Sequence, residues 1–300
     1  MSLAPAVVFT YNRADKAKKT LEALGNNYLA EQTDLYIFND QAAAEKPNDT
    51  ERVNNVREYL KFFQNSSPFH KTELIFAEQH KGLANSVIGG VTSVINQYQS
   101  VIVTEDDLVS NKNYLQYMNE ALQYYKNNTA IWSISAFTYD LPSCVNRSEV
   151  YFAYRGSSLG WGTWIDRWNT VDWSMQDFST LLLNPKRMKQ LNNAGRDLYT
   201  MLRNQKKGVI DSWAVRWVFA QTKNQKLTVY PPKTMIHNIG ADGEGTHHNI
   251  EVIQPFNPDE SIPYELGPVK MEAEVLNEFA ANFIDPYFHT HQHFHQNQLK

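Results

Sequence analysis

The chain has 300 residues, of which 42% are hydrophobic and 20% charged, and its formal net charge is −4. These values are typical of a globular protein with a sizeable core, and they exclude the basic footprint of a nucleic-acid-binding protein. The single cysteine, Cys144, excludes an intramolecular disulfide. No apolar stretch approaches the ~20 residues of a membrane span, and the first residues do not form a signal peptide. We therefore expect a cytoplasmic protein, with attachment to a membrane surface as a further option.

Short apolar segments alternate with amphipathic segments along the first half of the chain. Strands are expected at residues 6–10, 35–38, 73–77 and 101–103, and helices at about 15–24, 50–63, 83–98 and 114–125. This alternation predicts β-α-β units and a mostly parallel sheet with helices on both faces, a Rossmann-like α/β fold. Such sheets bind ligands at the carboxyl ends of their strands. The glycine fingerprints of dinucleotide and P-loop nucleotide sites are missing from the sequence.

Three adjacent carboxylates, Glu105, Asp106 and Asp107, directly follow the strand at 101–103. Their mutual repulsion opposes folding, so a partner of opposite charge is expected. Carboxylate oxygens are hard ligands for Mg²⁺ or Mn²⁺, and such ions often share their coordination shell with substrate phosphates. The alternative is a solvated acidic turn that precedes the helix at 114–125.

Two later segments allow a binding role or a structural one. Residues 154–164 are dense in glycine and tryptophan, so Trp161 could line a pocket as a stacking surface or lie in the core. Asp211 precedes a helix that runs through Arg216 and Phe219. It could cap that helix, or it could be a second carboxylate that faces the first cluster.

The last part of the chain is polar and rich in turn-forming residues. Residues 238–248 hold three glycines and could order over a phosphate or a metal, or form a mobile surface hairpin. We expect one unit at 1–250 and a C-terminal extension at 251–300, made of a linker, a helix at 272–283 and a histidine-rich tail. The tail could bind zinc, but we expect a polar terminus without a site.

Several motifs together resemble the nucleotide-sugar glycosyltransferases of the GT-A fold. The sequence Val-Thr-Glu-Asp-Asp-Leu at 103–108 is followed by an aromatic-rich helix and by Trp-Ser-Ile-Ser-Ala at 132–136. This order is similar to the N-acetylglucosaminyltransferase I type and to bacterial family 2-like enzymes. Further segments that agree in order are 10–13, 39–40, 80–86, 159–162, 211–213 and 238–247.

The resemblance implies a role for individual residues. Arg13 and Asp40 would hold the nucleoside, Asp106 the ribose and Glu105 the donor sugar, with Trp161 beside the donor. Asp107 would bind Mn²⁺ or Mg²⁺. His247 of the glycine loop is a further candidate for the metal or the diphosphate, and Asp211 would be the general base.

These roles predict a metal-dependent inverting glycosyltransferase. It would move a sugar from a nucleoside-diphosphate sugar, with uracil as the expected base, to a glycan or lipid-linked acceptor. Synthesis of a bacterial polysaccharide or surface glycan is the expected setting. The alternatives are a sugar-phosphate nucleotidyltransferase and a catalytically silent sugar-binding protein.

Overall fold

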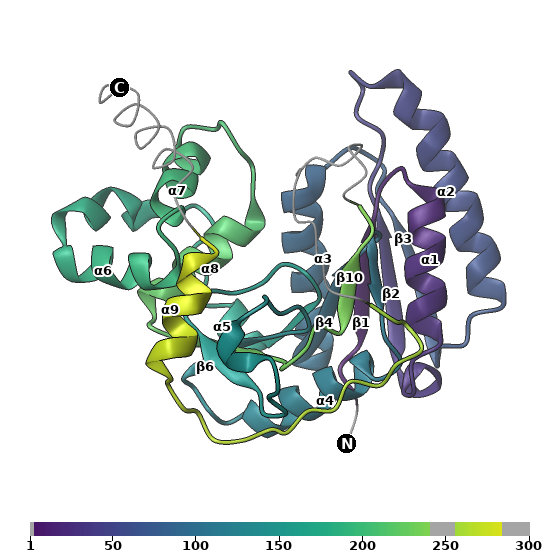
Figure 1. Cartoon of the computed structure of the whole chain (residues 1–300). Coiled ribbons are helices and arrows are strands. Elements are labelled where there is room, and N and C mark those ends of the chain that lie inside the picture. The colour runs from purple at the N-terminus through teal and green to yellow at the C-terminus, as the bar shows by residue number, and fades with distance from the viewer. Residues whose placement is uncertain (1–2, 241–255, 284–300) are drawn as a thin grey trace, which may run out of the picture.

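The computed structural model describes residues 3–240 and 256–283, and it contains a mostly parallel sheet covered by helices on both faces (Figure 1). In this part of the chain the main sheet has eight strands in the order β3-β2-β1-β4-β8-β6-β9-β7. The sequence-based prediction of an α/β fold is confirmed.

The first four strands run parallel and are linked by helices, as the alternation of the sequence predicts. They are β1 (Ala6–Thr10), β2 (Asp34–Asn39), β3 (Lys71–Phe76) and β4 (Ser100–Glu105). The linking helices are α1 (Ala14–Gly25), α2 (Pro47–Asn65) and α3 (Gly82–Tyr98). A short 3₁₀ turn, η1 (Ala30–Gln32), lies between α1 and β2.

Alternate residues of each central strand enter two separate cores, because successive side chains point to opposite faces. Val8 packs with residues of α1, α2 and α4 (Tyr114–Tyr125), whereas Val7 packs with residues of α3 and α8 (Trp213–Lys223). In Figure 1, α3 lies on one side of the parallel strands, and α1 and α2 lie on the other. Both faces of the strands are therefore buried, which explains their continuous apolar sequences.

The second half of the sheet is mixed. It contains β6 (Ile131–Ser135), β7 (Tyr151–Ala153), β8 (Trp161–Trp164) and β9 (Leu227–Tyr230). Strand β8 pairs antiparallel with both β4 and β6. The sequence did not predict β8, because its glycine and tryptophan residues resemble a turn more than a strand.

The polar segment between β8 and α8 is divided into several elements. These are η3 (Gln176–Leu183), α6 (Pro185–Ala194) and α7 (Leu198–Lys206), and a short helix, α5 (Ile165–Trp168), precedes them. Pro185 begins α6, and Gly195, with a φ of 141°, ends it. Both residues interrupt a continuous helix, since proline lacks the backbone donor and only glycine adopts that φ freely.

The C-terminal segment returns along the main body to α9 (Ala273–Ala281) (Figure 1). Asn113 donates a hydrogen bond to the Ile262 carbonyl and accepts one from the Ile262 amide, at 2.8 and 3.0 Å. Helix α9 packs through Val275 and Phe279 on β7 and on η2 (Pro142–Cys144). None of the helices in the described ranges combines the length and apolarity that crossing a membrane demands.

Candidate functional site

The acidic triplet lies at the point where the parallel sheet changes direction. From β1 the chain moves outward to β2 and β3, and it then returns to β4 on the other side of β1. Glu105 is the last residue of β4 and pairs with Phe9 of β1. The carboxyl ends of these two strands flank the point where the strand order reverses, which is the usual ligand position of an open α/β sheet. The sequence-based position of the triplet at the carboxyl edge is confirmed.

Arg13 connects the two central loops. Its Nη2 atom donates to Asp106 Oδ1 at 2.9 Å and to Asp107 Oδ2 at 2.7 Å. The backbone N–H of Tyr11 donates to the second oxygen of Asp106 at 3.1 Å. Arg13 Nη1 is buried and has no hydrogen-bond partner among the described residues. The structure thus brings Arg13, Asp106 and Asp107 together, with one guanidinium nitrogen left without a partner in the described part of the chain.

Burial and like charge raise the pKa of two of the three acids. Burial, followed by repulsion from Asp107 and Asp106, raises the pKa of Glu105 to about 8, against an ordinary 4.5. Burial also raises the pKa of Asp106 to about 6, although the Arg13 charge acts in the opposite direction. At neutral pH, Glu105 is therefore a neutral acid that can donate a hydrogen bond.

The glycine-rich segment begins at the triplet. Strand β10 (Ile236–Asn238) pairs with β5 (Leu108–Ser110), which follows directly after Asp107. The Ile239 N–H donates to the Asp107 carbonyl at 2.8 Å, and Lys16 Nζ donates to the Ile239 carbonyl at 2.8 Å. A Cβ atom on Gly240 would overlap the Asp107 carboxylate, so any larger residue here would require the Asp107 side chain to move. His247, the predicted metal or diphosphate ligand, lies outside the described residues.

Asp40 has a structural task that the sequence did not reveal. Its carboxylate accepts hydrogen bonds from the backbone N–H groups of Lys81 and Gly82, both at 2.9 Å at their shorter contacts, and pairs with His80 at 3.0 Å. It thereby satisfies free N–H groups at the start of α3. Asp40 lies at the carboxyl edge as expected, but its oxygens are already engaged by the protein, and its nucleoside contact stays a prediction.

Trp161 belongs to the core and does not offer an exposed stacking surface. Its side chain is 1% exposed, and its ring stacks on Trp213 and Trp168 with centroid distances of 5.0 and 5.8 Å. Strand β8 lies in the interior of the sheet, which buries Trp161 between β4 and α8. Of the two sequence-based interpretations, the core position is correct for this residue.

Asp211 is exposed and does not cap the helix that follows. Ser212 is the N-cap of α8, and its hydroxyl accepts a hydrogen bond from the Val215 N–H. Asp211 is 61% exposed at its side chain, and its Oδ1 accepts from Arg216 Nη2 at 2.7 Å. Trp213, two residues after Asp211, stacks on Trp161. Trp161 in turn pairs in the sheet with Val103, which lies two residues before Glu105. This chain of contacts places the start of α8 beside the end of β4, while the catalytic role of Asp211 stays a prediction.

Two residues that support the site were not predicted from the sequence. Lys16, one turn into α1, holds the start of the glycine segment, and Asn39 bridges the first two strand ends by donating to the Tyr11 carbonyl at 2.9 Å. The only signal was their position, since Lys16 lies three residues after Arg13 and Asn39 is the last residue of β2.

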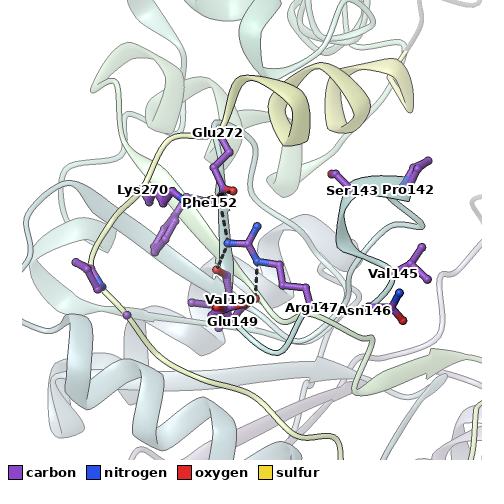
Figure 2. A pocket seen from close by; sticks show the side chains of 12 residues that line it. Pro142, Ser143, Val145, Asn146, Arg147, Glu149, Val150, Phe152, Lys270 and Glu272 are labelled. Carbon is purple, nitrogen blue, oxygen red and sulfur yellow. Dashed lines mark hydrogen bonds and ion pairs between the residues drawn. The ribbon is translucent and has the colours of Figure 1, made fainter.

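A separate pocket of about 510 Å³ lies away from the carboxyl edge (Figure 2). It is formed by the loop after η2, by residues next to β7 and by the C-terminal segment near Lys270. Arg147 on its floor pairs with Glu272 at 2.7 Å and also donates to the Glu149 and Val150 carbonyls. The Arg147 guanidinium is thus already bonded to protein groups, and none of the residues that line this pocket belongs to the acidic triplet.

Comparisons with known proteins find similarity among solved structures. No family model matches the sequence, and no curated protein matches it. Solved structures do match. One is the mannosyltransferase PcManGT from Pyrobaculum calidifontis in complex with GDP-Man and Mn²⁺. It has 9% sequence identity and a TM-score of 0.35, and the match covers 74% of this chain and 69% of the PcManGT chain. The glycosyltransferase GlyE of Streptococcus pneumoniae TIGR4 has 10% identity and a TM-score of 0.37, with coverage of 75% and 45%. TarS of S. aureus has 12% identity and a TM-score of 0.31, with coverage of 41% and 20%.

The PcManGT and GlyE structures are of a mannosyltransferase and a glycosyltransferase, the class of enzyme that the sequence motifs resemble. The match spans less than half of the GlyE and TarS chains. TM-scores of 0.31 to 0.37 are too low to transfer an activity, so function is inferred from the site itself.

Proposed function

We propose that this protein is a metal-dependent glycosyltransferase that uses a nucleoside-diphosphate sugar and inverts the anomeric centre. One observation carries the proposal. Two carboxylates bridged by Arg13 lie at the direction change of the sheet, directly beside the first glycine of a glycine-rich segment. A diphosphate with a divalent cation matches both the carboxylates and the close backbone approach.

The donor set is compatible with a cation that takes most of its ligands from the substrate. The described residues contain no group of three or more His, Cys, Asp or Glu side chains that could hold a metal alone. Mg²⁺ and Mn²⁺ sites built on one or two carboxylates plus phosphates need no such group. Asp107 Oδ1 has no hydrogen-bond partner in the described part of the chain, so Asp107 is the expected ligand. When bound, the cation would stabilise the negative charge that develops on the leaving nucleoside diphosphate.

The remaining groups would orient the donor. Neutral Glu105 would donate a hydrogen bond to the donor sugar, and Asp106 would accept one from the ribose. Arg13 Nη1, buried without a partner among the described residues, is the donor left for the nucleotide. Uracil is the proposed base, and His247 a proposed further contact to the metal or diphosphate.

Asp211 is the proposed general base. Arg216 engages only its Oδ1 among the described residues, which leaves Oδ2 to accept the proton of the acceptor hydroxyl as that oxygen attacks the anomeric carbon. The C–O bond to the diphosphate breaks as the new C–O bond forms on the opposite face. A single displacement of this kind inverts the configuration. The proposed acceptor is a glycan or lipid-linked saccharide in bacterial polysaccharide or surface-glycan synthesis, on the cytoplasmic side of the membrane.

A thermal-shift matrix tests the proposal. The protein is melted with UDP, GDP, CDP or TDP, each with Mn²⁺, Mg²⁺ or EDTA, because a ligand that binds only the native state raises the melting temperature. We expect one diphosphate to stabilise the wild type with metal and to lose most of that effect in EDTA or in Asp107→Asn.

Slow hydrolysis of the matching nucleotide sugar then separates an enzyme from a silent binder. Formation of a nucleotide sugar from a nucleoside triphosphate would indicate the nucleotidyltransferase instead. If none of the diphosphates shifts the melting temperature, the proposal is wrong.

A further inference from the structure

Helices α6 and α7 form a small unit that packs on α8. Their apolar side chains point inward, where Leu191 and Leu202 pack against Val215 and Phe219 around α8. In Figure 1 this unit lies on the opposite side of the molecule from α1 and α2. It leads directly into Asp211, since only residues 207–210 separate α7 from that carboxylate.

The outer surface of this unit is strongly basic, although the chain as a whole carries a net charge of −4. Between residues 186 and 207 the only acid is Asp197, and it is engaged by Arg155 at 2.8 Å. Arg187 pairs with Asp177. The remaining basic residues are all exposed and have no carboxylate partner among the described residues; these are Lys186, Lys189, Arg196, Arg203, Lys206 and Lys207, here named the α6–α7 basic surface.

Two large apolar side chains flank α6 and α7 in the sequence. Leu183, just before α6, is 83% exposed, and Val209, just after α7, is 67% exposed. Their near neighbours Leu181 and Ile210 pack into the apolar core of this unit, whereas Leu183 and Val209 point away from it into solvent. Exposed apolar side chains among unpaired cations match an anionic lipid surface, which takes charge at the headgroups and apolar groups below them.

We propose that the α6–α7 basic surface docks the protein onto membranes that contain anionic lipids, with Leu183 and Val209 entering the headgroup region. A soluble polyanion would satisfy the cations and leave the apolar side chains in water, so the lipid surface is the better match. Docking here brings the segment before Asp211 to the membrane. If the proposed function holds, docking at this surface would bring the hydroxyl of a lipid-linked acceptor to Asp211; this step rests on the proposed function.

Vesicle co-sedimentation of the full chain tests the docking. The vesicles contain phosphatidylcholine alone or with phosphatidylglycerol, at low and physiological salt. We expect binding only to the anionic vesicles and weakening with salt. The variant Lys186→Gln/Lys189→Gln/Arg203→Gln/Lys207→Gln should lose roughly a hundredfold or more in affinity, because each cation near an anionic surface contributes severalfold.

The matched control removes four exposed lysines from α1, α2 and β3: Lys18→Gln/Lys19→Gln/Lys61→Gln/Lys71→Gln. It should bind within a few-fold of wild type. A further variant, Leu183→Ser/Val209→Ser, should bind more weakly while keeping the salt dependence. The proposal is overturned if the two quadruple variants lose affinity equally, or if wild type binds neutral vesicles as well as anionic ones. It is also overturned if the serine variant binds like wild type and soluble polyphosphate binds as tightly as vesicles.

The vesicle assay needs no donor and no metal, so it is independent of the proposed chemistry. All variants should keep the wild-type melting shift with nucleoside diphosphate and metal. The docking proposal expects the basic-surface variant to lose vesicle binding and to keep the nucleotide melting shift. If wild type binds anionic vesicles but shows no melting shift with any nucleoside diphosphate, docking is correct and the glycosyltransferase proposal is wrong.

Discussion

Glu105 offers a direct test of the electrostatics of the triplet. Burial and the neighbouring aspartates raise its pKa from 4.5 to about 8. A carboxyl with a raised native pKa binds its proton more tightly in the folded state than in the unfolded state. Its contribution to stability is therefore complete below pH 4.5 and is lost as the pH rises to about 8. The steepest slope is about 1.4 kcal/mol per pH unit.

Between pH 6 and 8 the wild type should lose roughly 2 kcal/mol of unfolding free energy through Glu105, because the slope flattens as the pH approaches the native pKa. This is an upper limit, because the side chain keeps some contact with water. Asp106 adds little in this window, since its pKa is about 6. Glu105→Gln is neutral at every pH and should lack this decline.

Urea unfolding in EDTA at several pH values between 6 and 8 measures the effect. The difference between wild type and Glu105→Gln cancels the contribution of the histidines, which both proteins share. Glu51→Gln, an exposed acid on α2, is the matched control and should run parallel to wild type. If wild type and Glu105→Gln also run parallel across this range, the carboxyl is ionised throughout and the reasoning is refuted.

Four further substitutions test other parts of the structure. Asp211→Asn should abolish sugar transfer and keep the metal-dependent melting shift with nucleoside diphosphate; near-normal turnover would remove Asp211 from the mechanism. Ser212→Ala should lower the free energy of unfolding in urea by about 1 kcal/mol, because it removes the N-cap of α8. Asp211→Asn should lower it much less, since the ion pair of Asp211 is exposed. Equal losses for the two variants would contradict the capping assignment. Gly240→Ala should lower the metal-dependent affinity for nucleoside diphosphate about tenfold or more, as measured by the melting shift, because the added methyl group meets the Asp107 carboxylate. Gly89→Ala, in open space on α3, is the control and should leave this affinity unchanged. Trp161→Ala should destabilise the protein by about 3–5 kcal/mol through a core cavity, and a loss below about 1 kcal/mol in urea unfolding would show that the cluster is loosely packed.

The α/β class and the position of the acidic triplet could be predicted from the sequence. Both depend on local patterns: apolar segments such as 101–103 alternate with amphipathic helices, and in a parallel sheet every residue that follows a strand lies at one edge. The glycine segment could likewise be recognised from its composition, although only its first glycine lies within the described residues.

The contacts between side chains could not be predicted, because contacts between distant segments leave no local pattern in the sequence. The tryptophan that could have lined a pocket, Trp161, is buried because β8 inserts between β4 and β6. Asp40 caps α3 across 41 residues of chain. Arg13 reaches Asp106 and Asp107 only because β1 and β4 become neighbours, although more than 90 residues separate them in sequence. Periodicity describes which face of an element is apolar, whereas the pairing of strands determines which polar groups face each other, and that pairing is a property of the folded chain.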